Sequence, residues 1–462
     1  MRKGLTGCGG WLAALTLGCA PAAYAEFADA MKDYGAGNFT AAQTQFLALA
    51  ELGDCASQFN LGAMALKGQG GARDRGAGVG WLEAALSNGC RQQVGDKVPA
   101  LRASLTPEES RAAQAVLDRY GREALQARGI AAPQFSCPGQ TAASVLQSPA
   151  PEYPRHVGGA PEAIVITALT IGADGRAYDP EVLLAVPEPG FAAATIEAWL
   201  NARFAAAQRD GQAVASRLEA RQRFRGASGN LASEPSFKAA LAGAAAGEPA
   251  AEYQVGITAN LDSGLGVPAA RAGQLLSDAA RAGNAQAQYW VGSQVASTAE
   301  CNQKANARVW FEHAAAGGSA PAAVRLAREL LRGTPGDAEL TQARSLLARA
   351  AAADSYYANK HALALLAAAP QAQVHDPALA LQLAHKLAAG QIQSDPQLFE
   401  AIAAAYAVNG DFGKATAQQQ LALRKATALG WNTRVMEERL AGYRTGRPWS
   451  GELLALPPNA RP

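Results

Sequence analysis

Apolar residues recur at helical spacing along most of the chain, and they belong to a unit that repeats. The segments 53–62, 247–256 and 283–292 each begin and end with glycine and carry small or apolar residues at matching positions. The last two of these segments start 36 residues apart. A second amphipathic stretch follows each segment, beginning at Trp81, Leu275 and Trp310. One helix–turn–helix unit cannot bury its apolar face alone, so the period predicts an α-solenoid of stacked units with a concave groove.

Residues 53–89 resemble a Sel-one-like repeat, a short relative of the tetratricopeptide repeat. The matches include Gly68 and Gly70 in the turn and Trp81-Leu82 in the second helix. Units of this kind are expected in residues 26–130 and 233–370. Solenoids present grooves to protein partners. The resemblance therefore implies groove contacts from the first helix of each unit, at Gln58, Asn60, Gln254 and Tyr289.

Residues 371–447 continue the helical pattern and resemble a tetratricopeptide unit. Ala404-Ala405-Tyr406-Ala407 and Gly410-Asp411-Phe412 match the core of that repeat. Proline is frequent after this region, at Pro448, Pro457 and Pro458. Because proline cannot continue a helix, an irregular tail is expected over residues 448–462.

The periodicity changes from helix to strand in the middle of the chain. Several prolines predict a linker over residues 131–150. After it, residues 163–171 are rich in β-branched side chains and run into the turn sequence Gly172-Ala173-Asp174-Gly175. Residues 182–186 and 212–224 are further candidate strands, and residues 191–204 between them have helical spacing. The expected order of elements is β-β-α-β.

Residues 151–226 resemble a TonB C-terminal domain. The matching motifs are Pro151-Glu152-Tyr153-Pro154, Asp174-Gly175, Gly190-Phe191, Arg203-Phe204 and Asp210-Gly211. Ala205-Ala206 stands where the family has proline after Arg-Phe, which puts transducer activity in doubt. The resemblance implies binding rather than catalysis, because the last strand of the family is an open sheet edge that accepts an extended peptide. Here the edge is expected at about residues 214–222, with alternate positions Val214, Ser216, Leu218, Ala220 and Gln222.

Two interpretations of that edge stay open. It binds a peptide, or it is capped by the solenoid or by a second copy of the domain, since sheet edges are usually protected. Arg217, Arg221, Arg223 and Arg225 are expected on the same strand. They would either deter aggregation or attract an acidic peptide.

Composition narrows the classes of function. Of the 462 residues, 49% are apolar and only 6% are aromatic, which favours alanine-rich packed helices. With 41 Lys and Arg against 39 Asp and Glu, no broad basic surface is expected, and so no nucleic-acid partner. We find no nucleophile elbow, no phosphate-binding loop and no metal-ligand spacing among the five histidines. The chain is expected to have no catalytic residues, no metal site and no cofactor.

Residues 1–25 have the pattern of a secretory signal peptide. Arg2 and Lys3 precede an apolar stretch, and Ala23-Tyr24-Ala25 forms a cleavage site before Glu26. Two alternatives stay open: an uncleaved membrane anchor, and a lipoprotein with lipid on Cys19. Membrane contact is expected only in those two cases. Otherwise the protein is expected to be periplasmic, with envelope or periplasmic proteins or peptides as partners.

The mature chain would keep four cysteines, Cys55, Cys90, Cys137 and Cys301, which allow three pairings if all are oxidised. Cys55 begins the first helix of its unit and Cys90 follows the second. These two ends adjoin in an antiparallel hairpin, so we predict a Cys55–Cys90 disulfide. Free buried thiols are the alternative.

These patterns predict a mainly α chain, an α-solenoid of helix-turn-helix repeats interrupted by a small α+β (β-β-α-β) TonB C-terminal-like domain. The expected function is a non-enzymatic periplasmic protein–protein interaction scaffold or adaptor. The alternative is a TonB-family energy transducer for outer-membrane transport, which would need an anchor and a long spacer across the periplasm. An enzyme hidden among the repeats is the third hypothesis.

Overall fold

The computed structural model describes residues 26–90, 95, 97–130, 139–155, 163–186, 190–224, 235–261, 265–297 and 306–461. The expected export signal with Cys19 lies outside these residues, as do Cys137 and Cys301. No helix within the described part of the chain has the length and apolar character needed to span a membrane.

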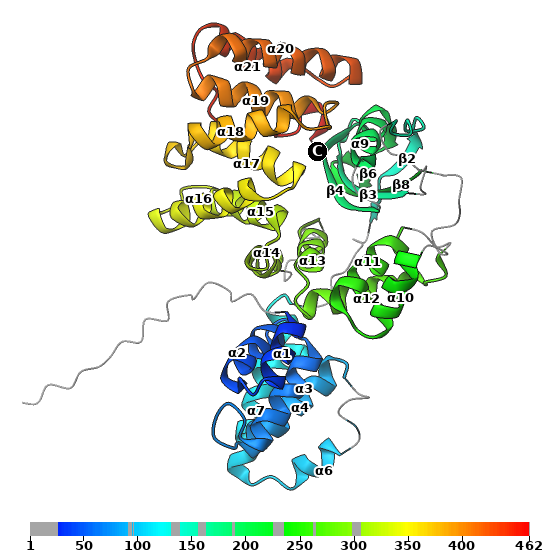
Figure 1. Ribbon diagram of the computed structural model, residues 1–462, viewed down its shortest axis with the longest axis vertical. Coiled ribbons are helices and arrows are strands. Elements are labelled where there is room, and N and C mark those ends of the chain that lie inside the picture. The colour runs from blue at the N-terminus through cyan, green and yellow to red at the C-terminus, as the bar shows by residue number, and fades with distance from the viewer. Residues whose placement is uncertain are drawn as a thin grey trace, which may run out of the picture.

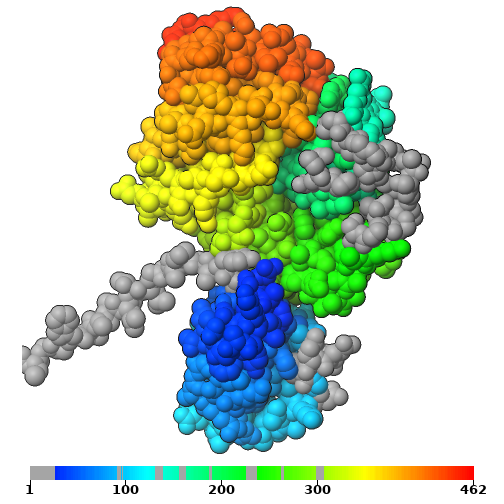
Figure 2. All heavy atoms as spheres, viewed as in Figure 1, coloured from blue at the N-terminus to red at the C-terminus, as the bar shows by residue number. Residues whose placement is uncertain are grey.

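The first block of the chain is helical (Figure 1). Its helices are α1 Phe27–Gly35, α2 Phe39–Ala50, α3 Cys55–Lys67, α4 Arg75–Asn88, α6 Val98–Ala103, α7 Pro107–Tyr120 and α8 Arg122–Ala127. Their shared core contains Phe46, Met64, Trp81 and Tyr120. The block packs on the rest of the molecule through the α1 end, where the Phe27 amide donates to the Ala282 carbonyl. Figure 2 shows it at one end of the molecule.

The second helical block follows the α+β domain and forms the long stack in Figure 1. Its α-helices are α10 Pro235–Ala245, α11 Pro249–Ala259, α12 Ala269–Arg281, α13 Ala285–Ser297, α14 Ala307–Ala316, α15 Ala320–Leu330, α16 Asp337–Ala352, α17 Tyr356–Ala368, α18 Pro377–Ala388, α19 Pro396–Val408, α20 Phe412–Leu429 and α21 Arg434–Arg444. Two short 3-10 helices are η3 Ala372–Val374 and η4 Pro458–Ala460.

The glycines of the repeat explain how paired helices approach so closely. The last glycine of the motif is Gly62 in one unit and Gly292 in another. A Cβ atom added to Gly62 would lie 3.0 Å from the Gly78 carbonyl oxygen, and one added to Gly292 would lie 2.8 Å from the Phe311 ring. The first glycine serves the turn instead, since Gly53 has a φ of +84°. The repeat spacing found in the sequence therefore corresponds to real helix pairs.

The α+β domain has more strands than the four-element pattern predicted. They are β1 Gln140–Thr141, β2 Ser144–Gln147, β3 Ala163–Ile171, β4 Ala177–Val186, β5 Arg203–Ala205, β6 Ala207–Arg209, β7 Gln212–Val214 and β8 Ser216–Phe224, with helix α9 Phe191–Asn201 after β4. The main sheet is antiparallel in the order β4-β3-β8. Its β-β-α-β order is the predicted one.

Two predicted boundaries were wrong. Residues 140–141 and 144–147 of the expected linker form β1 and β2, which pair with β6 and β5. Val214 is not on the edge of the main sheet, because it belongs to β7 and faces Ala207 of β6 in a separate hairpin. These strands have two to four residues each, too few for a pattern to show.

The main sheet is covered on both faces. Ala163 and Val165 of β3 pack with Phe191 of α9. The alternate residues Ile164 and Ile166 pack with Tyr253 and Trp290 of the second helical block. Because successive residues of a strand point to opposite faces, eight of the nine residues of β3 are buried. The main sheet is thus the middle layer, with α9 on one face and the solenoid on the other.

Candidate functional site

Strand β4 lies along the inner side of the solenoid. Tyr253 of α11 donates its hydroxyl hydrogen to the Leu183 carbonyl, 3.2 Å away. Further back along β4, Tyr289 of α13 donates to Glu181 and Gln397 of α19 accepts from the Asp179 amide. The adjoining turn reaches the last helices and the tail, since Arg176 donates to the Leu429 carbonyl and the Ala173 amide donates to the Ala460 carbonyl. As the residue numbers fall from 183 to 173, the residues that they contact rise from 253 to 460.

A buried charge cluster fixes the middle of this contact. Lys360 of α17 is fully buried, with its Nζ 2.8 Å from Asp395 Oδ2 and 3.1 Å from Asp179 Oδ1. His361 Nε2 lies 2.7 Å from the same oxygen of Asp179. Tyr356 donates to Asp395 at 2.8 Å. Every carboxylate in the cluster therefore has a cation or a donor beside it.

The pKa directions follow from this pairing. Burial alone would raise the pKa of the Asp179 carboxyl, but His361 and Lys360 hold it well below its usual value. Burial lowers the pKa of His361 to about 4, so its ring is neutral near neutral pH. Burial would likewise depress the pKa of Lys360, yet Asp395 and Asp179 raise it. The cluster carries one cation between two carboxylates.

The inner surface of the solenoid is therefore occupied by the chain itself, and the groove contact predicted at Tyr289 was wrong. Its side chain is 4% exposed and bonds Glu181 Oε2 at 2.9 Å. The same oxygen lies 3.1 Å from Arg217 Nη2 of β8. Arg217 thus neutralises a buried glutamate of its own domain.

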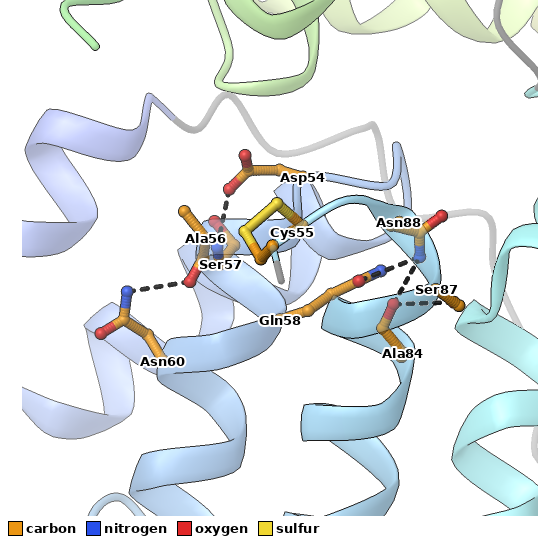
Figure 3. Close-up of a disulfide and its surroundings, with 10 residues drawn as sticks. Asp54, Cys55, Ala56, Ser57, Gln58, Asn60, Ala84, Ser87 and Asn88 are labelled. Atoms are coloured by element: carbon orange, nitrogen blue, oxygen red, sulfur yellow. Dashed lines mark hydrogen bonds between the residues drawn. A yellow bond between two sulfur atoms is a disulfide. The ribbon is translucent and has the colours of Figure 1, made fainter. Parts of the chain in front are cut away.

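Gln58 was also wrong as a groove contact. It is fully buried, and its Nε2 donates to the carbonyls of Ala50 and Tyr120, both at 3.2 Å. Its Oε1 accepts from Asn88 Nδ2 at 3.0 Å (Figure 3). Asn60 is half-buried and bonds the Ala56 carbonyl, and Gln254 is half-buried on α11. Neither of the last two is brought to the cleft described next.

A cleft of about 1100 Å³ lies where three regions of the described chain meet. The first helical block forms one wall, and helices α11 and α12 form another. The third wall consists of residues 217–219 of β8 with Trp290 and Gln294 of α13. The first wall contains Asp54, Cys55, Gly89 and Cys90. Its volume is at the upper end of the roughly 300–1,000 Å³ of ordinary ligand pockets. We call this hollow the junction cleft.

The junction cleft contains part of the predicted edge strand. β8 pairs with β3 on one side, and no strand in the described residues pairs with it on the other. Of the predicted edge positions, only Leu218 lines the cleft. Ser216 and Gln222 are half-buried outside it, and Ala220 is buried in the core beside Trp199. The accessible stretch is therefore shorter than expected.

A disulfide holds the wall of the first block. The structure joins Cys55 at the start of α3 to Cys90 after α4, with their Cα atoms 5.5 Å apart (Figure 3). Asp54, directly before Cys55, caps α3 by accepting from the Ser57 amide at 2.7 Å. The bond thus fixes the end of a helix pair at the cleft surface.

The opposite wall carries carboxylates. Glu252 of α11 and Asp278 of α12 line the junction cleft, together with Asp54 and Glu219. Burial, and next the charge of Asp278, raise the pKa of Glu252 to about 7, whereas Arg271 acts in the opposite direction. Burial also raises the pKa of Asp54 and of Asp278. No motif in the sequence points to Glu252. Aligning the repeats could have found it, because glutamine stands at the same position of the units at Gly53 and Gly283.

Comparison with known proteins adds little to this geometry. No protein-family model matches the chain, and no curated protein matches it significantly. One solved structure with a detectable likeness is a protective antigen of uropathogenic Escherichia coli strains, described as displaying an SLR fold. The identity is 16%, the TM-score is 0.34, and the match covers 91% of this chain and 81% of that one. A superposition this loose carries no argument about fold or function.

Among the residues that the structure describes, no group of three or more His, Cys, Asp or Glu side chains is placed to hold a metal ion. The arrangement that remains is a walled cleft with an edge strand, buried carboxylates and helix ends, which suits the binding of another polypeptide.

Proposed function

We propose that this protein is a non-enzymatic protein–protein interaction scaffold of the periplasm, and that it binds an extended segment of an envelope or periplasmic partner in the junction cleft. The observation that supports this is the meeting of the β8 edge with repeat helices around one cleft. An edge strand offers backbone bonds to an extended peptide, and the surrounding side chains give selectivity. The inner face of the solenoid is not the binding surface in this proposal, because β4 fills it.

A selection experiment tests the binding. The mature chain is used to select from a library of random unstructured peptides, and the affinities of the selected peptides are then measured. Gln274 of α12 is exposed and lines the cleft, so Gln274→Trp is expected to weaken binding by at least about tenfold, or ~1.4 kcal/mol. Gln342→Trp, on the exposed face of α16 outside the cleft, is the control and should bind as the wild type does.

The peptide itself provides the second arm. If backbone bonds to residues 217–219 hold it, methylation of alternate peptide amides should weaken binding while the side chains stay unchanged. Failure to select any peptide, or equal binding by Gln274→Trp, would refute the proposed function.

The location needs its own measurement. We expect the intact mass of the native protein to correspond to a chain that starts at Glu26 and fractionates with the soluble periplasm. A chain that keeps Met1 in the inner membrane would instead favour the energy transducer. A lipid mass on Cys19 would indicate a tethered scaffold.

A further inference from the structure

Glu252 departs from the pattern of its own repeat. It is the sixth residue of the unit that starts at Gly247, and the sixth residues of the units at Gly53 and Gly283 are Gln58 and Gln288. Both glutamines are buried and donate from Nε2 to a carbonyl eight residues earlier, that of Ala50 at 3.2 Å and that of Ala280 at 3.1 Å. An ionised carboxylate has no hydrogen to donate, so Glu252 cannot make the bond that its equivalents make.

No side chain or backbone group among the described residues bonds this carboxylate. Glu252 is 7% exposed and lines the junction cleft. Its side chain has no hydrogen bond and no ion pair with any residue that the structure describes. A buried charge normally has a partner, because an ion that loses its hydration is destabilised unless an opposite charge or hydrogen bonds replace the water. The missing partner would come from the cleft.

The surroundings are negative as well. Asp54, Glu219, Glu252 and Asp278 line the cleft, against Arg122, Arg217 and Arg281. Arg217 is already paired with Glu181, which lies outside the lining. Arg122 donates to the Ser87 carbonyl. Arg271 lies 4.0 Å from Asp278, and it does not form a bond with Glu252. Carboxylates therefore outnumber the cations left to neutralise them.

We propose that the junction cleft receives a lysine or arginine side chain of the bound segment, and that Glu252 is its main counter-charge. This inference rests on the proposed function and adds the chemistry of the partner. An acidic peptide, one of the two alternatives left open for the arginines of β8, is less favoured at the cleft, because Arg217 is paired with Glu181 inside the protein. Residues 217–219 would hold the backbone while Glu252, with Asp54 and Asp278, holds the cation.

Matched peptides test this assignment. One unstructured peptide of alternating threonine and valine carries lysine, arginine, norleucine or glutamate at its centre, and each version is titrated into the mature chain at pH 8. We expect the lysine and arginine peptides to bind at least about tenfold more tightly than the norleucine peptide, since hydrogen bonds between charged groups are stronger than those between neutral groups. The glutamate peptide should bind most weakly.

Two variants separate Glu252 from the rest of the cleft. Glu252→Gln installs the residue of the equivalent units, so it should fold, and it should reduce the preference for lysine to less than about threefold. Glu248→Gln is the control: Glu248 begins the same helix but is exposed, and it makes no capping bond. For the wild type, affinity for the lysine peptide should fall as the pH is lowered from 8 to 6, because Glu252 becomes protonated.

The outcomes distinguish the two proposals. If no peptide of any charge binds the wild type, the proposed function fails. If all versions bind equally, the cleft binds peptides and the cation preference is refuted. If the preference persists in Glu252→Gln, a different carboxylate holds the cation and the assignment to Glu252 is wrong.

Discussion

The solenoid buries carboxylates in two places and treats them differently. At the β4 contact, Asp179 and Asp395 share Lys360 between them, and His361 and Tyr356 complete their bonding. At the junction cleft, Glu252 is nearly as buried and has no partner among the described residues. The pKa of Asp179 is accordingly held well below its usual value, while that of Glu252 is raised to about 7.

The difference separates a contact whose buried charges all have partners from a cleft wall where one buried carboxylate has none. Paired charges inside a contact hold one arrangement of two layers, because each ion has lost water and gained a fixed neighbour. An unpaired charge at a cleft wall lowers the stability of the free protein and is retained most readily where a ligand supplies the neighbour. The Lys360 cluster joins the α+β domain to the solenoid, and Glu252 lies on the surface that we propose binds the partner.

The largest effect should come from breaking the paired cluster. Lys360→Met removes the cation between Asp179 and Asp395 and leaves two buried carboxylates facing each other. We expect a loss of about 3–5 kcal/mol in the free energy of unfolding, measured by urea denaturation at pH 7. Because β4 would lose its fixed contact, protease cleavage of the α+β domain should also become faster.

The control for that experiment is an exposed ion pair. Arg434 and Glu438 lie 2.7 Å apart one turn along α21, with 64% and 50% of their side chains exposed. Arg434→Gln should cost no more than about 0.5 kcal/mol. A similarly small loss for Lys360→Met would mean that the cluster does not hold the two layers together.

The cleft wall depends on a covalent bond instead. Replacing both cysteines, as Cys55→Ser with Cys90→Ser, should lower the free energy of unfolding by about 2–4 kcal/mol, because the 35-residue loop is no longer closed in the unfolded chain. It should also weaken peptide binding, since Asp54 adjoins Cys55. Peptide mapping without reductant checks the bond directly. If both cysteines of the native protein are free thiols, the disulfide is absent and no covalent bond holds this wall of the junction cleft.

Local patterns were sufficient for much of this architecture. The repeat is visible because equivalent glycines recur after 36 residues. The Cys55–Cys90 disulfide was predictable because the two cysteines lie at adjoining ends of one helix hairpin, 35 residues apart. The strand order of the α+β domain was predictable for the same reason, because β3, β4 and β8 have nine or ten residues each and are long enough for a pattern to show. Short strands such as β1 and β2 are too brief to show one.

The docking of β4 could not be predicted in this way. The contacts that fix it join residues 182 apart, at Asp179 and His361, and 253 apart, at Arg176 and Leu429. No local pattern records such a pairing. The sequence therefore predicts Tyr289 as a partner contact in the concave groove, although its hydroxyl bonds Glu181 of β4. The prediction for Gln58 failed for a different reason. A polar residue on the first helix of a unit was expected to contact a partner, but the Gln58 side chain is buried and bonds the carbonyls of Ala50 and Tyr120 on neighbouring helices.

The smallest and sharpest effect concerns Glu252 itself. Its pKa in the folded protein is raised to about 7 from an ordinary value of 4.5, with Asp278 and Arg271 of α12 and Asp54 of the first block as the charged groups that face it. A group whose pKa is raised on folding supports the folded state while it is protonated. That contribution is complete below about pH 4.5 and is lost as the pH rises through about 7. Glu252→Gln removes the dependence.

We therefore expect Glu252→Gln to be more stable than the wild type at pH 8 by about 1–2 kcal/mol, a value reduced from the full shift because the cleft is open to water. The advantage should shrink toward pH 5, where the glutamate is mostly protonated. Urea denaturation at several pH values measures it, with Glu248→Gln expected to follow the wild type throughout. A variant that gains stability at pH 8 while losing the lysine preference would show that one residue exchanges stability for binding. Equal stability of both proteins at every pH would mean that Glu252 is not desolvated, and the contrast with the Lys360 cluster would disappear.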